Sequence, residues 1–334
     1  MFSSSAALLK LRMRATASKA RIKWMGGIFR MDADKENSKE RFHIGIDLGG
    51  TKIEGIVLDH QYRECRRIRM ETRSSDGYAN VLQRIIEIHS QLAMVALGKE
   101  VTLGICTPGS ISKTNGLLKN CNATELNGHP LQADLLQRLG RPFTMENDAN
   151  CFAIAEARHG AGSGHGCVLG IVLGTGVGAG IVVNGHLWSG RHGIAGEWGH
   201  MSVDPNGPPC YCGRKGCAER YLSGAALEAN YQQSTGQSAD AARIVEMARR
   251  GNKAAFDVLD QFLSRFAGAV ANVVAVLDPD AIVIGGGLAS IDELYEEGAL
   301  RLQRMVFNDA FHTPVLRNRL GNSAGVIGAA MVGV

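Results

Sequence analysis

The fold of this chain is decided by the stretch Asp47-Leu-Gly-Gly-Thr-Lys52, a glycine turn between two runs of residues with the pattern of β-strands. A second turn of the same kind, Gly174-Thr-Gly-Val-Gly-Ala-Gly180, separates two further strand-like runs. Glycine lets backbone N–H groups approach an anion closely, and threonine hydroxyls add donors. Neither turn has the strand-to-helix GxGxxG pattern of dinucleotide-binding folds. Either turn alone could be a tight hairpin, but the pair predicts a phosphate clamp in a nucleotide site.

The pattern around the two turns is repeated along the chain. The first unit predicts strands at residues 42–47, 53–58, 63–71 and 101–106, and a helix at residues 79–97. The second unit predicts strands at residues 167–173, 178–183, 186–188 and 281–284, and helices at residues 225–233, 239–250 and 253–277. Such a repeat indicates a duplicated α/β fold of two domains, with the ligand site in the cleft between them.

The length of 334 residues suits two domains. We expect a smaller domain at residues 42–146, a hinge near residues 145–150 and a larger domain at residues 147–321. The final stretch, residues 322–334, has small and apolar residues at helical spacing, so we expect a helix that returns to pack on the first domain.

The first 30 residues carry seven Lys or Arg and no acid, which is the composition of an organellar transit peptide. Met25 and Met31 are alternative start positions, so we interpret residues 1–41 as a disordered leader or an upstream extension. The remaining chain has 29 basic and 32 acidic residues, so it lacks the excess of basic charge that is typical of nucleic-acid-binding proteins. It also has no apolar run of transmembrane length. We therefore expect a cytoplasmic protein with no nucleic-acid or membrane partner.

The segment between Glu197 and Glu219 is rich in metal-binding side chains. Its three thiols and one imidazole are those of His200, Cys210, Cys212 and Cys217. Four such ligands at close spacing indicate a closed tetrahedral zinc site, which is structural rather than catalytic. A disulfide or a set of unrelated core residues is the alternative, but disulfides are rare in the cytosol and Cys-x-Cys neighbours bridge poorly. The predicted zinc insertion, residues 200–217, would hold the flanking carboxylates of Glu197 and Glu219 in fixed positions on one side of a binding site.

Two further motifs carry chemistry. Glu146-Asn-Asp-Ala-Asn150 comes just before a predicted helix at residues 149–158. Its Asn147 or Asp148 is a candidate N-cap, and the carboxylate of Asp148 could also accept a hydroxyl proton during phosphoryl transfer. A glycine run at residues 285–287 follows a buried strand and would let a flat adenine lie against the backbone.

Together these motifs resemble the ROK family of sugar kinases, over the chain from about residue 42 to the C-terminus. The resemblance implies the actin/hexokinase-like (ribonuclease H-like) fold, with ATP at the glycine turns and Mg²⁺ held indirectly near Asp47. It also suggests a homodimer. The ATP-binding residues that it implies are Asp47, Gly49, Gly50, Thr51, Lys52, Gly174, Thr175, Gly176, Gly178, Gly286 and Gly287.

The resemblance also implies which residues handle the sugar. Asp148 would be the general base. The implied sugar ligands are Gly109, Asn122, Asn147, Asp148, Glu197, His200 and Glu219. His200 would give one ring nitrogen to zinc and the other to the sugar, so the metal would fix its tautomer.

The identity of the sugar is a separate question. Residues 107–111, 119–128 and 209–213 are most similar to bacterial fructokinases, so we expect phosphorylation of fructose at its 6-hydroxyl. A kinase of N-acetylglucosamine, N-acetylmannosamine or glucose is the alternative. Glu125 stands where an aromatic residue is expected, which puts acceptance of bulky or N-acetylated sugars in doubt. A sugar-responsive ROK transcriptional regulator is the alternative from another class, but about 41 residues before the first strand are few for a winged helix-turn-helix.

Overall fold

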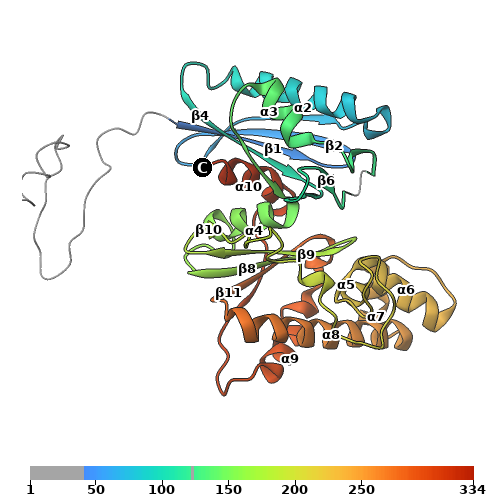
Figure 1. The fold of residues 1–334 in the computed structure, drawn as a ribbon. Coiled ribbons are helices and arrows are strands. Elements are labelled where there is room, and N and C mark those ends of the chain that lie inside the picture. Colours follow the sequence, from blue (N-terminus) through green and yellow to red (C-terminus); the bar gives the residue numbers. More distant parts are fainter. Residues whose placement is uncertain (1–40, 122–123) are drawn as a thin grey trace, which may run out of the picture.

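The computed structural model describes residues 41–121 and 124–334. The predicted leader lies outside these ranges except for Arg41, and so does the predicted sugar ligand Asn122. Two five-stranded sheets lie one above the other, with helices on their faces (Figure 1). Within the described ranges, no helix combines the length and the apolar character that a bilayer span requires.

The first sheet has the strand order β3-β2-β1-β4-β7, with β1 antiparallel to β2 and parallel to β4. Its strands are β1 (Arg41–Leu48), β2 (Lys52–Leu58), β3 (Glu64–Glu71), β4 (Glu100–Thr107) and β7 (Thr144–Asn147). Helices α2 (Tyr78–Ala93) and α3 (Leu131–Leu139) cover one face (Figure 1). Ile85 and Ile88 of α2 are fully buried in one cluster with Ile44 and Ile46 of β1. This half therefore has its own hydrophobic core.

The second sheet repeats the same order as β10-β9-β8-β11-β12. Its strands are β8 (Cys167–Leu173), β9 (Val177–Val183), β10 (His186–Leu187), β11 (Ala281–Gly285) and β12 (Val315–Arg317). Its outer helices are α5 (Glu219–Leu222), α6 (Gly224–Thr235), α7 (Ala241–Arg249), α8 (Lys253–Leu277) and α9 (Glu297–Met305). Leu169 of β8 packs toward α8, whereas Val168 packs toward the opposite helix, α4 (Asp148–His159). Both faces of this sheet are therefore buried, as period-two alternation requires.

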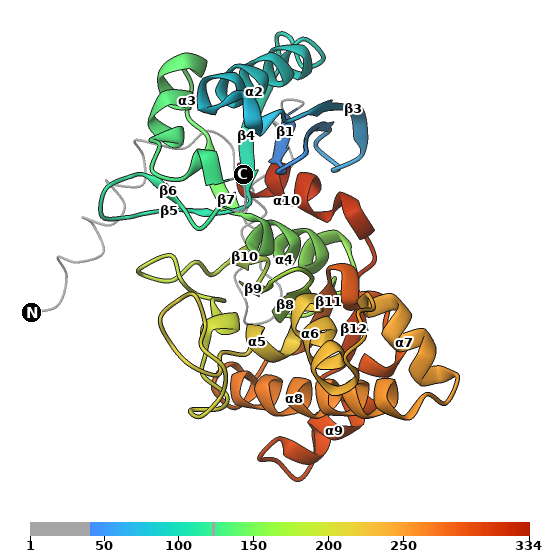
Figure 2. The same cartoon turned by 90° about the vertical axis from the view of Figure 1, so that its right-hand side faces the viewer.

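Helices α4 and α10 (Ala324–Val332) form the layer between the two sheets (Figure 2). Helix α10 contacts β1 and β4 of the first sheet, and it also packs along α4. Helix α10 lies so close to β4 and to α4 that glycine is required at both contacts. A Cβ at Gly104 of β4 would overlap the Ala329 carbonyl of α10, and a Cβ at Gly328 of α10 would overlap the Cys151 carbonyl of α4. The C-terminal segment is therefore part of the contact between the two halves.

The remaining elements are short. A hairpin of β5 (Ser110–Ile111) and β6 (Leu118–Lys119) extends from the first half (Figure 2). The 3-10 helices are η1 (Ser74–Asp76), η2 (Thr124–Leu126), η3 (Trp198–His200), η4 (Gly287–Ser290), η5 (Asp292–Leu294) and η6 (Gly321–Ser323).

The predicted duplication is confirmed, because the two sheets share one strand order. Each sheet also has a fifth strand that the sequence pattern missed. β7 has only four half-buried residues and β12 only three residues, which is too short for a periodic signal. The chain leaves the first sheet at the end of β7 and enters α4 directly, within residues 145–150, where the hinge stays a prediction. The domain boundaries themselves stay a prediction.

Candidate active site

One cavity of about 290 Å³ lies between the two halves of the molecule. Ten residues of the predicted site line it: Gly109, Asn147, Asp148, Gly174, Thr175, Gly176, Gly178, Glu197, His200 and Glu219. They come from the loop after β4, the β7–α4 junction, the second glycine turn and the cysteine-rich segment. Residues that are far apart in the sequence are thus brought to one place.

Asp148 is the first residue of α4, at the head of the helix that separates the sheets. The N-cap is Asn147, whose side-chain oxygen accepts from the backbone N–H of Asn150 at 2.8 Å, so Asp148 does not cap the helix in its place. The Asp148 carboxylate accepts from the N–H of Ala149 at 2.8 Å and stays accessible through the cavity. Burial among protein atoms raises its pKa, and the charge of Glu197 raises it further. This is the environment expected of a general base.

Asp47 stands at the end of β1, next to the first glycine turn. Burial, with the Asp148 charge nearby, raises its pKa to about 6, although a hydrogen bond with Cys106 acts in the opposite direction. A Cβ at Gly325, in the first turn of α10, would lie 2.7 Å from the Asp47 carboxylate. The close approach of α10 is therefore one cause of this burial.

The first glycine turn lies outside the lining of the cavity, although all of its residues are described. The Gly49 N–H donates to the Lys52 carbonyl at 2.9 Å, and the Thr72 hydroxyl donates to the Gly49 carbonyl at 2.6 Å. The N–H of Thr72 also donates to the Thr51 carbonyl at 2.8 Å. Lys52 pairs with the buried Glu54 at 3.3 Å, while Gly50 is exposed. The turn is therefore held in shape by its own neighbours.

The second glycine turn and the glycine run after β11 lie side by side. A Cβ at Gly174 would lie 3.9 Å from the backbone nitrogen of Gly287, and the Gly174 carbonyl accepts from the N–H of Gly224 at 2.8 Å. Gly286 has φ +85, where an L-residue is strained, and a Cβ there would overlap the Leu173 carbonyl. The predicted phosphate turn and the predicted adenine surface are thus adjacent.

The carboxylate of Glu219 is attached to the second glycine turn. Its Oε2 accepts from the N–H of Val177 at 3.0 Å. Glu197, the other carboxylate of this segment that lines the cavity, directly precedes Trp198. The indole N–H of Trp198 donates to the Gly178 carbonyl at 3.1 Å. The segment that carries both carboxylates is therefore fixed against β9.

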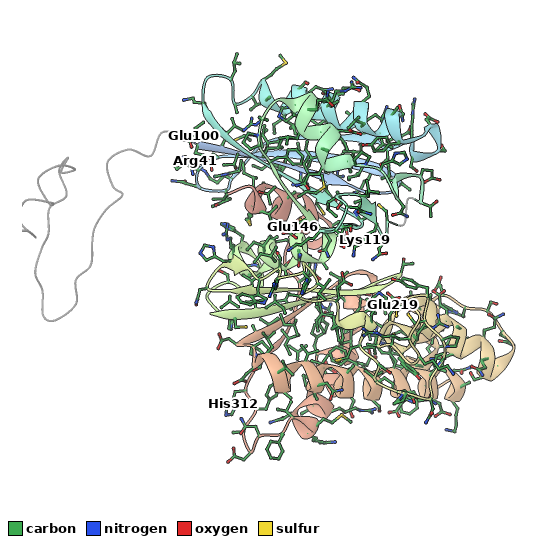
Figure 3. The ribbon with its side chains drawn as sticks, in the orientation of Figure 1. Arg41, Glu100, Lys119, Glu146, Glu219 and His312 are labelled. Carbon is green, nitrogen blue, oxygen red and sulfur yellow. The ribbon has the colours of Figure 1, made fainter. Side chains whose placement is uncertain are left out.

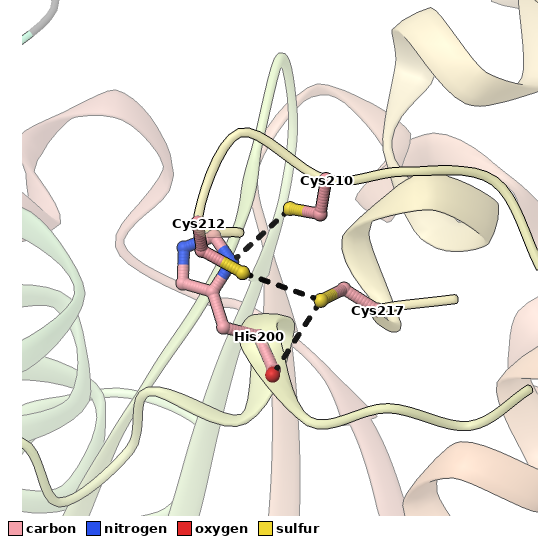
Figure 4. Close-up of side chains that lie close together, drawn as sticks. All are labelled: His200, Cys210, Cys212 and Cys217. Atoms are coloured by element: carbon pink, nitrogen blue, oxygen red, sulfur yellow. Dashed lines mark hydrogen bonds between the residues drawn. The ribbon is translucent and has the colours of Figure 1, made fainter. Parts of the chain in front are cut away.

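The predicted zinc ligands converge on one point (Figure 4). One donor atom from each of the four side chains lies within 4.8 Å of the others. The Cys210 sulfur is 3.6 Å from Nδ1 of His200, and the sulfurs of Cys212 and Cys217 are 3.5 Å apart. Four sulfur or nitrogen atoms around a zinc ion at about 2.3 Å would stand about 3.8 Å from one another. The residues therefore fit a tetrahedral zinc ion, with Nδ1 as the imidazole donor.

Comparison with known proteins identifies the family. Residues 43–333 match the model of the ROK family. The chain belongs to the ROK family. Its fold is therefore the actin/hexokinase-like fold predicted above, and solved ROK structures superpose on it. The ROK hexokinase of Thermus thermophilus is 31% identical, with a TM-score of 0.79 over 87% of this chain and 97% of that one.

Two further relatives bear on activity. The N-acetyl-D-glucosamine kinase of Haemophilus influenzae is 36% identical over 299 residues, which cover 86% of this ROK chain and 98% of the relative. The ROK family glucokinase of Streptomyces griseus, solved in complex with glucose and AMPPNP, is 30% identical. Its TM-score is 0.70 over 87% of this chain and 98% of that one.

In this ROK protein, Tyr211 contacts the predicted site residue His200, which the sequence pattern did not indicate. Its hydroxyl lies 3.0 Å from Nε2 of His200, and the two rings meet edge to face with centroids 5.0 Å apart. Tyr211 stands between two predicted zinc ligands, Cys210 and Cys212. Its partner depends on how the loop folds, which no pattern in the sequence reports.

A second, larger cavity of about 700 Å³ adjoins the first. It is lined by the β5–β6 hairpin and the loop after it, which contribute Lys119, Asn120, Asn127 and Gly128. Asn120, Thr175, Gly176, Tyr211 and Glu219 line both cavities. Figure 3 shows Lys119 on the first half of the molecule and Glu219 on the second. The described residues of this loop therefore lie beside the candidate site.

Glu146 is another side chain to which the sequence analysis gave no role. Its carboxylate accepts from the Asn150 amide at 2.8 Å and from the Ser189 hydroxyl at 3.1 Å. Glu146 belongs to β7 of the first sheet, whereas Asn150 belongs to α4 and Ser189 follows β10. One carboxylate thus ties the junction that carries Asp148 to the second half.

Proposed function

We propose that this ROK protein is an ATP-dependent kinase of N-acetylglucosamine that phosphorylates the 6-hydroxyl of the sugar. The observation that carries the proposal is the position of Asp148, at the head of α4 in a cavity that also contains a glycine turn, two wall carboxylates and His200. A carboxylate beside a bound sugar can take the hydroxyl proton, and a glycine turn offers backbone donors to phosphate.

The choice of sugar rests on the relatives. The N-acetyl-D-glucosamine kinases of Haemophilus influenzae and Pectobacterium atrosepticum are each 36% identical to this chain. The expectation of fructose has no such support. We therefore propose N-acetylglucosamine, which was among the alternatives to fructose in the sequence analysis. Glu125 is exposed and lies outside the lining of both cavities, so it does not narrow the site against an N-acetyl group.

The chain's own residues divide the work in this proposal. Asn147, Glu197, His200 and Glu219 bind and orient the sugar hydroxyls from the cavity wall, and the Gly109 backbone contacts the sugar. Glycine is needed at this position because a Cβ would overlap the Lys119 carbonyl. Ionised Asp148 accepts the proton of the attacking hydroxyl, a step typically worth about 10²–10⁴-fold in rate. ATP supplies the phosphoryl group, and Mg²⁺, held indirectly near Asp47, would neutralise its phosphates.

The nucleotide would lie along the three glycine segments. Gly174, Thr175, Gly176 and Gly178 would face its phosphates from the second half, and Gly286 and Gly287 would face the adenine. The turn at residues 49–52 stands outside the cavity lining, so we propose that it reaches the phosphates when the two halves close at the hinge near residues 145–150. Closure also excludes water, which would otherwise compete for the phosphoryl group.

We further propose that His200, Cys210, Cys212 and Cys217 hold a structural Zn²⁺. A closed set of four ligands leaves no position for a substrate. The ion would instead fix the loop between Glu197 and Glu219 and orient the sugar-facing nitrogen of His200.

The test is an ADP-release assay of the purified protein with Mg²⁺-ATP and a panel of N-acetylglucosamine, N-acetylmannosamine, glucose, mannose and fructose. We expect the highest kcat/KM with N-acetylglucosamine. Highest efficiency with fructose would restore the first expectation and refute this choice of sugar. Turnover of none of the sugars, by a folded protein with zinc bound, would refute the proposal as a whole.

A further inference from the structure

Tyr211 has an unusual position for a tyrosine. Its side chain is 76% exposed, so it does not belong to the hydrophobic core. Its hydroxyl is nevertheless engaged at 3.0 Å by Nε2 of His200, a residue of the cavity wall. The loop that carries it bends tightly here, because the Gly213 N–H donates to the Cys210 carbonyl at 3.0 Å and the Cys210 N–H donates to the Arg214 carbonyl at 2.8 Å. Tyr211 is thus presented to His200 by the loop of the cysteine cluster.

The two nitrogens of His200 have separate partners. Nδ1 faces the cysteine cluster, 3.6 Å from the Cys210 sulfur, and Nε2 is the remaining polar atom of the ring. When Nδ1 is a metal ligand, Nε2 carries the proton and can only donate a hydrogen bond. The group at hydrogen-bond distance from Nε2 is the hydroxyl of Tyr211, at 3.0 Å, and its oxygen would accept from this protonated nitrogen. A sugar hydroxyl has the same chemistry and would need the same N–H.

The structure also shows where the tyrosine could go. Tyr211 lines the cavity that contains Asp148 and, in addition, the adjoining cavity of about 700 Å³. Its ring packs against His200 only by an edge-to-face contact, and most of its surface is open to solvent. A rotation about its side-chain torsions can therefore move the hydroxyl away from His200 without disturbing the core.

We propose that Tyr211 is a gate whose hydroxyl occupies the place of a sugar hydroxyl on Nε2 of His200 and is displaced into the larger cavity when the sugar binds. The proposal rests on the proposed sugar-binding function of this cavity. It means that the free protein already satisfies the donor that the sugar needs. A sugar gains from His200 only the difference between the two hydrogen bonds, so the hydroxyl of Tyr211 weakens sugar binding.

The decisive variant is Tyr211→Phe, which removes the hydroxyl and keeps the ring. We expect its Kd for N-acetylglucosamine, measured by calorimetry without nucleotide, to fall by about 2–10-fold, since one modest hydrogen bond no longer competes. Tyr211→Ala should also bind more tightly than the wild type, because it lacks the same hydroxyl. Zinc content and Tm of both variants should equal those of the wild type.

The matched control is Tyr221→Phe. Tyr221 belongs to the neighbouring α5, and its hydroxyl donates to Asp204 at 2.9 Å outside both cavities, so its loss should leave the Kd unchanged. An unchanged or raised Kd in Tyr211→Phe would overturn the gate, and a raised Kd would show that the hydroxyl binds the sugar itself. Absence of sugar binding in the wild type would overturn it too. Binding is measured without turnover, so a wild type that binds the sugar but does not phosphorylate it refutes the kinase proposal alone.

Discussion

At the scale of single residues, the fold changes the pKa of two carboxylates, one that lines the cavity between the halves and one near the end of β1 that lies outside the cavity lining. Asp148 and Asp47 come from different elements, α4 and β1, and burial raises the pKa of both. The sequence could identify Asp148 because its motif is specific, and could suggest Asp47 from the turn beside it. It could not show the raised pKa of Asp47, because its burial depends in part on α10, which approaches Asp47 from the far end of the chain.

The raised pKa of Asp47 predicts a conflict between stability and function. The ordinary pKa of 3.8 applies to the unfolded chain and about 6 to the folded protein, so ionised Asp47 destabilises the fold increasingly as pH rises from about 4 to 6. Asp47→Asn should therefore raise the free energy of unfolding of the ligand-free protein by about 1–3 kcal/mol at pH 7.5. In urea unfolding experiments, this gain should disappear as pH falls toward 4, whereas kcat should drop.

Asp59 provides the matched control with the opposite sign. Hydrogen bonds from Arg63 and Gln61 lower its pKa to about 2. Its ionised form therefore stabilises the fold above pH 4, and Asp59→Asn should lower the free energy of unfolding at pH 7.5. If Asp47→Asn lowered the free energy of unfolding at pH 7.5, as Asp59→Asn should, the raised pKa of Asp47 would be contradicted.

At the scale of elements, the segment from Glu197 to Glu219 joins the His/Cys cluster, the cavity wall and the second glycine turn. It carries Glu197 at one end and Glu219 at the other, and the Glu219 carboxylate accepts from the second glycine turn. The four ligands could be predicted from their spacing alone, because short Cys and His clusters have few other uses. The contact between Tyr211 and His200 could not, because it arises only once the loop has folded around the cluster.

A prediction for this element concerns Cys212→Ser. Removing one of four ligands should lower zinc content and Tm and raise the Kd for N-acetylglucosamine, because the loop no longer holds the wall carboxylates. Metal analysis, thermal unfolding and calorimetry measure the three effects. Cys65→Ser is the control: Cys65 is exposed on β3, far in the sequence from the cluster, and its replacement should change none of them. Wild-type zinc content and Tm in Cys212→Ser would count against structural zinc.

The whole molecule is a duplication with a shared middle layer. The two sheets repeat one strand order, and α4 and α10 lie between them. Sequence periodicity predicted most of this arrangement, since long buried strands and the helix at residues 253–277 give clear signals. Two contacts between the halves were not predictable: the Glu146 carboxylate with Ser189, and the Lys113 ammonium with the Arg191 carbonyl at 3.2 Å. In both contacts the two residues are far apart in the sequence, and no motif or periodicity relates them.

The most direct test of the whole account is kcat for N-acetylglucosamine in the wild type and in Asp148→Asn, measured side by side with Mg²⁺-ATP. The amide keeps the size of the carboxylate but cannot take the hydroxyl proton, so the account predicts a loss of about 10²–10⁴-fold. Zinc content and Tm should be retained, and the Kd for the sugar should stay within a few-fold. A variant with near wild-type kcat would contradict the assignment of Asp148 as general base, and with it the mechanism derived from this cavity.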